Sequence, residues 1–534
     1  MVDKLNSLSD SLKKYDPTFG IEVHVELKTK TKMFCPAPNP AYDNSAPAAN
    51  TSLTPVSLGL PGVLPVLNKK ALEYAIRIGL ALNCKIAERC HFSRKNYFYP
   101  DMTKNFQTSQ YDEPICYDGY VDVEVGGGDT GLELKTFRVE IERAHMEEDA
   151  GKNTHVGGDA GRIHGAKYSL VDYNRAGVPL VEIVTRPVQG AREYTPYLAA
   201  AYVKTLRDIF VAIGVSNAQM EKGNVRADVN LSLAPAKSDS AVRDASSKGA
   251  TDTGANDSDV AFEDLGTRTE TKNVNSFKSI EKAVIYEVRR QAAVLDSGEK
   301  VTQETRHWHE DIAGTSSGRP KSDSDDYRYF PEPDLLPVEP SREWVEEIRA
   351  TLPELPAVKR NRLKTEWGFN DLEMRDSINA GVLELIEEAT THGITATDAK
   401  KWYLGDLSRI AKETSVEVSE LNVTPKQIAG LQSLINSKDI NVKIASEVLN
   451  RVLDGEGEPA EIVEKQGLKI VSDDGLLQKV IDETLADKPD IVAKIKEGNM
   501  APIGAVMGAV MKATKGQADA GTARELILKS IEAM

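Results

Sequence analysis

The chain has 534 residues but few cysteines and no long apolar run. Its four cysteines, Cys35, Cys84, Cys90 and Cys116, cannot form a disulfide framework in a chain of this length, and no two are spaced C-x-x-C. The N-terminal segment has no apolar signal-peptide core, and no stretch reaches the ~18 apolar residues of a transmembrane helix. We therefore expect a soluble, unexported, cytoplasmic protein with reduced thiols and no membrane partner.

Positive charge and the common nucleotide-binding motifs are also lacking. A net charge of −16 argues against nucleic-acid binding through bulk positive charge, although a local basic surface stays possible. Neither G-x-x-x-x-G-K-[ST] nor G-x-S-x-G occurs. GGGDTG, at Gly126 to Gly131, formally matches G-x-G-x-x-G, but it leads into the strand-like FRVEIER, so we interpret it as a hairpin turn. Any enzymatic activity must therefore use an uncommon nucleotide site.

The composition is globular, with 40% hydrophobic and 28% charged residues. Alternating strand patterns fill residues 20–337, with helical spacing over 71–82, 194–213 and 279–295. After residue 341 only amphipathic helices are indicated. We predict an α+β fold: a domain with a mixed or antiparallel sheet over 1–337, a helical domain over 338–423 and a helical tail over 424–534. Residues 236–264, rich in Ser, Ala, Gly and Asp, are predicted to be a disordered insert between strands.

Several predicted strands carry polar side chains on one face. In GIEVHVEL, Glu22, His24 and Glu26 alternate with apolar residues. A single strand of this kind usually turns its polar face to water. The pattern recurs, however, in VRADVNLSL and in TRTETK, so these strands could line a common concave surface. The polar positions of those two strands are Arg226, Asp228, Asn230 and Ser232, and Arg268, Glu270 and Lys272.

Further acidic residues indicate metal or phosphate chemistry. Glu182 interrupts the apolar run of PLVEIV, and a carboxylate buried there needs a cation, a partner or access to water. AHMEEDAGK adds Glu147, Glu148 and Asp149 beside Lys152, which on its own is more typical of a solvated acidic turn. Carboxylates with one imidazole and no thiolate suit Mg²⁺ or Mn²⁺ better than structural zinc. Lysines and arginines on adjacent strands suit the phosphates of a nucleotide.

Eight sequence blocks, in a fixed order, closely resemble the B subunit of the aspartyl/glutamyl-tRNA(Asn/Gln) amidotransferase. The resemblance runs from about Gly20 to Pro337, resumes in GNMAPIGAVMGAVMKATKGQAD, and so covers nearly the whole chain. The eight blocks are GIEVHVELKTKTKMF, LGLPGVLPVLNKKALEYAIRIGLALNC, RKNYFYPDMTKNFQTSQYDEPI, HMEEDAGK, YSLVDYNRAGVPLVEIVTRP, TETKNVNSF, QETR and DDYRYFPEPDLLPV.

The resemblance implies a ligase of protein biosynthesis with a cradle-like catalytic domain. In that heterotrimer, the A subunit releases ammonia from glutamine and the C subunit supports the assembly. This chain would use ATP and Mg²⁺ to phosphorylate the side-chain carboxylate of misacylated Glu-tRNA(Gln) or Asp-tRNA(Asn). Ammonia would then attack the acyl phosphate while water is excluded. A metal-dependent hydrolase and a non-catalytic tRNA-binding scaffold stay open as alternatives.

The resemblance also assigns site residues. By similarity, His24, Glu148 and Glu182 would hold the Mg²⁺. Glu22 would be a further catalytic acid, and Asp228 a catalytic or nucleotide-side carboxylate.

Charge and motif position add further candidates. Glu147 and Lys272 are expected in the catalytic group, and Lys152 and Asn275 are expected to contact the nucleotide or substrate. Each could equally be a solvated or structural polar residue. Glu26 has no assigned role, and we expect it to meet water.

One departure from the family concerns zinc. Many members have paired cysteines after the first strand and a C-P-x-C before LGLPG. Here only Cys35 is present, and Thr54 and Ser57 replace the later pair. One thiol cannot complete a four-ligand zinc site, so we predict no structural zinc.

The tail contains one clear helical stripe. Lys512 and Lys515 could contact phosphates, and by resemblance the tail contacts the outer, elbow side of the tRNA. Gly504 and Gly508 would permit close helix packing. The apolar positions, predicted to be core, are Ile503, Val506, Met507, Val510 and Met511.

Overall fold

The computed structural model describes residues 5–533 except 158–164, 237–264, 321–326, 471–473, 488, 497–499, 501 and 514–519. Contacts divide the chain into two units, Met1–Pro356 and Ala357–Met534. The predicted insert lies outside the described residues apart from Ala236, and so does Lys515. Among the described residues, no helix has both the length and the apolar character needed to cross a membrane.

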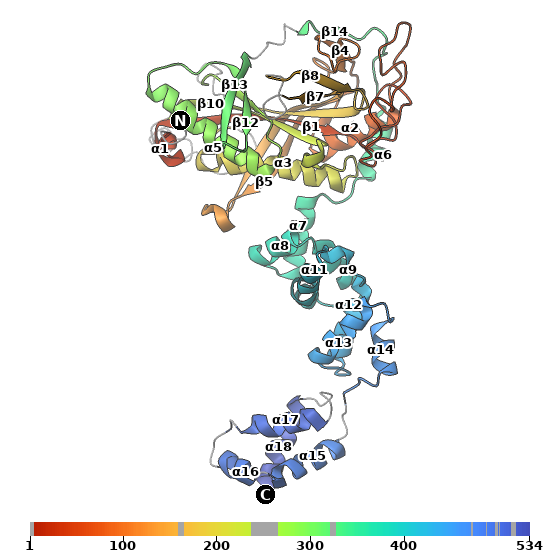
Figure 1. Cartoon of the computed structure of the whole chain (residues 1–534), viewed down its shortest axis with the longest axis vertical. Helices are drawn as coiled ribbons and strands as arrows, with labels where there is room; N and C mark the ends of the chain where they lie inside the picture. The colour runs from red at the N-terminus through yellow and green to blue at the C-terminus, as the bar shows by residue number, and fades with distance from the viewer. Residues whose placement is uncertain are drawn as a thin grey trace. The chain divides into compact units, whose positions relative to one another are not determined.

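A nine-stranded mixed sheet forms the body of the first unit (Figure 1). Neighbouring strands are antiparallel except β11 and β12, which are parallel. The strands, in their order across the sheet, are β13 (Gly314–Pro320), β12 (Glu304–His309), β11 (Thr269–Lys272), β10 (Val225–Pro235), β1 (Tyr15–Glu26), β9 (Pro179–Thr185), β6 (Lys135–Glu148), β5 (Cys116–Val125) and β2 (Lys85–Ile86).

Helices cover one face of this sheet. α3 (Thr195–Ala212) and α5 (Phe277–Asp296) pack against each other and against the sheet, and α2 (Lys69–Ala81) packs on β5 and β6 (Figure 1). α1 (Leu8–Lys14) contacts α5, and α6 (Arg342–Ala350) contacts α2. The three predicted helices are thus confirmed. Ile21, Val23 and Val25 of β1 are buried in this core, so strand alternation directs Glu22 and His24 to the opposite face.

Two small sheets complete the first unit. One contains β14 (Phe330–Pro331), β3 (Ser93–Asn96) and β4 (Phe106–Ser109) in that order, and β4 also contacts β6. The other is the antiparallel pair β7 (Lys152–Val156) and β8 (Tyr168–Asp172). Both small sheets are therefore joined to the strands that carry the polar face.

The GGGDTG segment is a turn between β5 and β6, as predicted. Its residues 128–130 form one 3₁₀ turn rather than a phosphate-binding helix start. Gly126 has φ 112°, and a Cβ there would overlap the carbonyl of Glu133. Glycine is thus needed for chain reversal at this position.

The second unit is helical throughout its described part, with two separate cores. The first core runs from Leu363 to Val463 and the second from Ile481 to Ile531. The helices are α7 (Pro356–Trp367), α8 (Asp371–Asn379), α9 (Leu383–Thr391), α10 (Ala396–Trp402), α11 (Ser408–Thr414), α12 (Pro425–Asn436), α13 (Val442–Leu453), α14 (Pro459–Lys465), α15 (Asp474–Asp487), α16 (Pro489–Lys496), α17 (Ile503–Ala513) and α18 (Ala520–Ala533).

The boundaries between parts lie later than expected. Trp344, Val345 and Ile348 of α6 pack on the first core, so the first unit extends to Pro356 instead of 337. The next core continues across the expected boundary at 423, because α12, α13 and α14 pack with the helices before them. Patterns of polarity therefore located the helices, but not which core each helix joins.

The α17 stripe is core, as predicted, but its glycines are not packing sites. Ile503, Val506 and Val510 are buried, with Met507 and Met511 packed beside them. A Cβ at either Gly504 or Gly508 would meet open space. The expectation of close helix packing at these glycines is therefore wrong, because both positions face away from the neighbouring helices.

Candidate functional site

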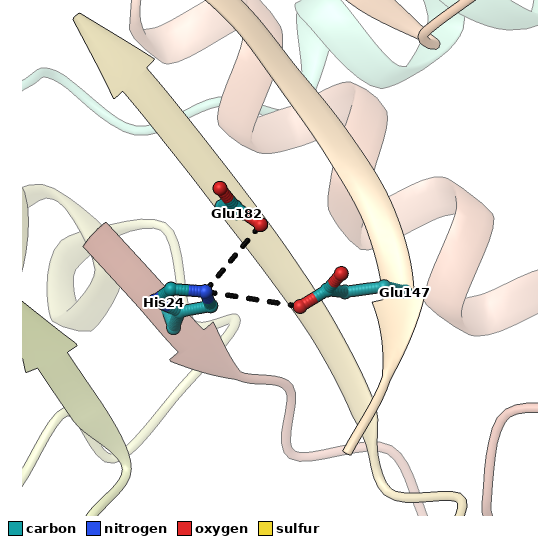
Figure 2. Close-up of side chains that lie close together, drawn as sticks. All are labelled: His24, Glu147 and Glu182. Atoms are coloured by element: carbon teal, nitrogen blue, oxygen red, sulfur yellow. Dashed lines mark ion pairs between the residues drawn. The ribbon is translucent and has the colours of Figure 1, made fainter. Parts of the chain in front are cut away.

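Three strands bring His24, Glu147 and Glu182 together on the polar face of the sheet (Figure 2). His24 of β1 lies opposite Glu182 of β9, and Glu147 comes from β6. His24 Nε2 is 3.4 Å from Glu182 Oε2 and 3.8 Å from Glu147 Oε1. One ligand atom from each residue lies within 4.8 Å of the others. We call these three residues the first cluster.

The first cluster combines charges of both signs, two carboxylates and one imidazole. Although burial alone would lower the pKa of His24, the charges of Glu182 and Glu147 raise it to about 9. Burial would raise the pKa of Glu182, but His24 and His145 hold it well below its usual range. The imidazolium thus offsets part of the carboxylate charge, and a divalent cation could neutralise both carboxylates. Two carboxylates and an imidazole fit a hard cation such as Mg²⁺ or Mn²⁺.

Glu148, expected as a metal ligand, lies apart from the first cluster. Lys104 Nζ and, at 3.0 Å, the N–H of Thr108 donate to its Oε1. Glu147 occupies the place expected for Glu148, and Ser109 Oγ donates to its Oε2 at 3.1 Å. The reason is strand alternation: β6 pairs regularly with β9 from Arg143 to its last residue, so only one of two consecutive glutamates can face His24.

A second cluster lies beside the first and consists of Glu22, Asp228 and Glu270, from β1, β10 and β11. Lys272 Nζ donates to Asp228 Oδ2 at 2.5 Å and lies 3.6 Å from Glu270 Oε1. Burial alone would lower the pKa of Lys272, but the charges of Asp228 and Glu270 raise it. Asn230 Nδ2 donates to Glu22 Oε1 at 3.0 Å. The structure therefore brings together Glu22, Asp228 and Lys272, three of the predicted catalytic residues.

Glu26 does not meet water, so that expectation is wrong. Its side chain is buried and accepts a hydrogen bond from Asn224 Nδ2 at 3.1 Å. Burial raises the pKa of Glu26 to about 7, and the charge of Asp149 adds to this. Burial acts the same way on Asp149, but Arg175 and Arg226 outweigh it and lower the pKa of Asp149 to about 2. This group is a structural ion network at the end of β1.

Two predicted nucleotide contacts lie elsewhere. Lys152 is exposed on β7 opposite Asp172, and Asn275 is exposed between β11 and α5. Within the described residues, no hydrogen bond or ion pair joins either to the two clusters.

Sequence reasoning missed two residues close to the first cluster, His145 and Lys95. His145 is buried, with Nε2 3.4 Å from Glu182 Oε2, and its Nδ1 has no hydrogen-bond partner among the described residues. Strand alternation places His145, two residues before Glu147, on the same face of β6, so the sequence AHMEED could have indicated it. Burial alone would lower the pKa of Lys95, but the charges of Glu147 and Glu182 help to raise it. Lys95 belongs to the RKNYFYPD block, which carries the family resemblance but no local signal of a cation at the site.

A cavity of about 560 Å³ lies next to the second cluster, lined by residues of β1, β9 and β10 and by the segment from Leu265 to Arg268. Glu22 and Asn230 line its polar side, and Phe19 and Leu231 contribute apolar surface. Gly266 is also part of the wall, and a Cβ there would overlap the carbonyl of Leu233. The cavity is large enough for a small organic ligand.

Comparison with known proteins identifies the family. Residues 17–346 match the family model described as the GatB/GatE catalytic domain, and residues 384–531 match the GatB domain. Curated relatives named as the B subunit of aspartyl/glutamyl-tRNA(Asn/Gln) amidotransferase include those of Paenarthrobacter aurescens (strain TC1), 58% identical over 530 residues, and Streptomyces coelicolor, 53% identical over 527. These alignments cover 99% of this chain in both cases, and 99% and 98% of the relatives. The chain belongs to the B-subunit family of the aspartyl/glutamyl-tRNA(Asn/Gln) amidotransferases. Both clusters of this B-subunit family member lie inside the catalytic-domain match.

In this B-subunit family member, hydrogen bonds hold the loop around Cys35, Thr54 and Ser57, for which we predict no zinc. Cys35 Sγ lies 3.4 Å from Ser57 Oγ, and Thr54 Oγ1 lies 3.1 Å from the same oxygen. Thr103 Oγ1 donates to the carbonyl of Ser57 at 2.7 Å. One thiol and neutral hydroxyls are not a zinc donor set, and these bonds connect the two loop segments instead.

Proposed function

We propose that the chain activates the side-chain carboxylate of misacylated Glu-tRNA(Gln) or Asp-tRNA(Asn), using ATP and Mg²⁺, for amidation by ammonia. The single observation that carries the activation step is the pair of neighbouring carboxylate clusters, with Lys272 between two of the carboxylates, on one sheet face. The names of the relatives indicate a tRNA substrate and an amidotransferase reaction. An acidic, cation-lined site of this kind suits phosphoryl transfer, which depends on positioning and charge neutralisation.

The chemistry follows from the substrate. A carboxylate does not react with ammonia until one of its oxygens becomes a leaving group. A carboxylate oxygen therefore attacks the γ-phosphorus of ATP, a new O–P bond forms, and the bond to the β-phosphate oxygen breaks to release ADP. Ammonia then attacks the acyl carbon, the C–O bond to phosphate breaks, and the amide, inorganic phosphate and a proton are released.

The residues of the first cluster would hold a divalent cation, and Glu22, Asp228 and Glu270 form a second set of the same kind. When bound, such cations supply charge neutralisation for the transferring phosphoryl group. Lys272 already carries a positive charge at the second cluster, where it would attract phosphate oxygens. The cavity beside Glu22 and Asn230 has room for the nucleotide base and sugar next to the second cluster.

The other components of the proposal rest on family membership. We expect a glutaminase partner, the A subunit, to supply ammonia, a small C subunit to support the assembly, and the helical tail to contact the tRNA. The complex would act in the cytoplasm.

ATP consumption by the chain co-expressed with candidate A and C subunits tests the proposal. The expected result is ATP consumption that depends on misacylated Glu-tRNA(Gln) and on Mg²⁺, and that is lost in Glu182→Gln. Glu124→Gln, at an exposed carboxylate on β5, is the matched control and should keep the activity. Turnover without ATP or tRNA would favour a metal-dependent hydrolase. An assembled Glu182→Gln complex with full activity would favour a scaffold.

A further inference from the structure

Four tyrosine rings form a continuous row on the small sheet β14–β3–β4 and its flanking loops. Tyr97 and Tyr327 meet edge to face at 6.2 Å between ring centroids, and Tyr327 meets Tyr329 at 6.3 Å. Tyr329 and Tyr111 are stacked at 4.4 Å with 11° between the ring planes. We call Tyr97, Tyr327, Tyr329 and Tyr111 the tyrosine row.

The two middle members of the tyrosine row, Tyr327 and Tyr329, lie by the first cluster. The Nζ of Lys95 lies 5.2 Å from the centroid of the Tyr327 ring. Burial raises the pKa of Tyr329 to about 12, and the charges of Glu147 and Glu182 add to this, so the ring lies within electrostatic reach of those carboxylates. The β4 residue Ser109, from the same small sheet, donates to Glu147. The small sheet is thus fixed against the wall of the first cluster.

The outer end of the tyrosine row reaches solvent. Tyr111 is 43% exposed, and one of its faces is already covered by Tyr329. Aromatic side chains in a row, with a lysine beside one of the rings, form the kind of platform on which unpaired bases of single-stranded nucleic acids stack. The row therefore offers an aromatic path from solvent to the carboxylates.

The reaction needs a base at this position. The side-chain carboxylate that is activated belongs to an amino acid esterified to the ribose of the tRNA's 3′-terminal nucleotide. The terminal base is joined to the reacting carboxylate only through the ribose, the ester and the amino-acid side chain, so it must lie near the reacting group. The base of ATP has a separate place, because the 560 Å³ cavity adjoins the second cluster, on the β10 side of β1, whereas the tyrosine row adjoins Glu147 on the β6 side.

We propose that the tyrosine row binds the unpaired 3′-terminal base of the aminoacylated tRNA by stacking and thereby places the ester-linked amino acid at the first cluster. This inference rests on the proposed function for the identity of its ligand. Tyr111 is the member of the row on which the base stacks, and Tyr329 stacks on the other face of the Tyr111 ring. Lys95 lies where the row meets the carboxylates, so it faces the phosphorylated intermediate.

The test uses the full chain, assembled with the A and C subunits, and a tRNA(Gln) that carries 2-aminopurine at its 3′ end. Stacking on a tyrosine quenches the fluorescence of 2-aminopurine, and this binding measurement needs no turnover. Tyr111→Ala should weaken the quench and raise the KM for unmodified Glu-tRNA(Gln) about tenfold, the size expected for one lost base–aromatic stack. Its KM for ATP should not change. Tyr168→Ala, at an exposed tyrosine on β8, is the matched control.

Each outcome bears on the inference separately from the proposed function. Quenching by the wild type that Tyr111→Ala loses supports the tyrosine row, even if no ATP consumption is found and the proposed function fails. A raised KM for ATP in Tyr111→Ala, with tRNA binding intact, would mean that the row binds the base of ATP. A folded Tyr111→Ala variant with unchanged quench and both KM values unchanged would overturn the inference while leaving the proposed function intact.

Discussion

Replacing Glu26 with glutamine should stabilise the first unit at pH 8 and change its stability much less at pH 5. Glu26 is buried, and its pKa is raised from 4.5 to about 7, mainly by that burial. The native state therefore keeps a proton on this carboxyl between pH 4.5 and 7, where the unfolded chain has lost it. Glutamine is neutral at every pH and can still accept the hydrogen bond from Asn224.

The sign and size follow from linkage between protonation and folding. Since the native state binds more protons in this range, the free energy of unfolding falls as pH rises from 4.5 to 7 and then levels off. At 1.36 kcal/mol per pKa unit, the full penalty is about 3 kcal/mol, most of which develops between about pH 5 and 8. His24, whose pKa is raised from 6.5 to about 9, adds its own pH dependence between these two values. Because His24 is present in both the wild type and the variant, its contribution cancels when their free energies of unfolding are subtracted.

Urea-dependent hydrogen exchange, read by mass spectrometry on peptides from β1, measures this unfolding in the unit that carries Glu26. The free energy of unfolding of Glu26→Gln, minus that of the wild type, should be larger at pH 8 than at pH 5 by about 2–3 kcal/mol. Glu124→Gln, on the exposed side of β5, should show no such pH-dependent difference. An equal difference at both pH values, or a larger one at pH 5, would refute the reasoning.

Three further predictions concern backbone and loop positions. Gly266→Ala should lower the stability of the first unit by about 1–3 kcal/mol, because its Cβ would overlap the carbonyl of Leu233, and a thermal melt without a lowered Tm would contradict this. Gly508→Ala should raise the stability of the second unit by about 0.8 kcal/mol, because alanine favours the interior of helix α17 and its Cβ meets open space. A lowered Tm would show that the glycine is required. Elemental analysis of the purified chain should find far less than one zinc per chain, since Cys35 is the only thiol of the loop, and one tightly bound zinc would contradict the hydrogen-bonded loop.

Much of the fold could be predicted because its signals are local. Alternation in GIEVHVEL indicates a strand with one polar face, and β1 turns that face away from α3 and α5. Helical spacing likewise located α2, α3 and α5. The helix α6 is an element whose packing partner such local signals do not predict. Its apolar face indicates that it packs on something, but only the structure shows that it joins the first core.

The sequence indicated many residues of the candidate site, but not which of them lie together. Glu182 was conspicuous because it interrupts an apolar strand, and cross-strand register explains how it meets His24. That register is a long-range property, and nothing in either strand alone specifies it. The choice between Glu147 and Glu148 depended on whether strand alternation continues to the end of β6. Glu26 continues the polar face of β1, but the loop containing Asn224 covers it.

The most direct test of the central claim is to ask which residues hold the cation at the first cluster. Mn²⁺ bound to the full chain can be examined by electron spin echo spectroscopy, which detects coupling to an imidazole nitrogen. This coupling distinguishes the first cluster, which contains His24, from the second, which has only carboxylates. We predict the coupling in the wild type and in Glu148→Gln, and its loss in Glu147→Gln. Loss of the coupling in Glu148→Gln with retention in Glu147→Gln would contradict the assignment.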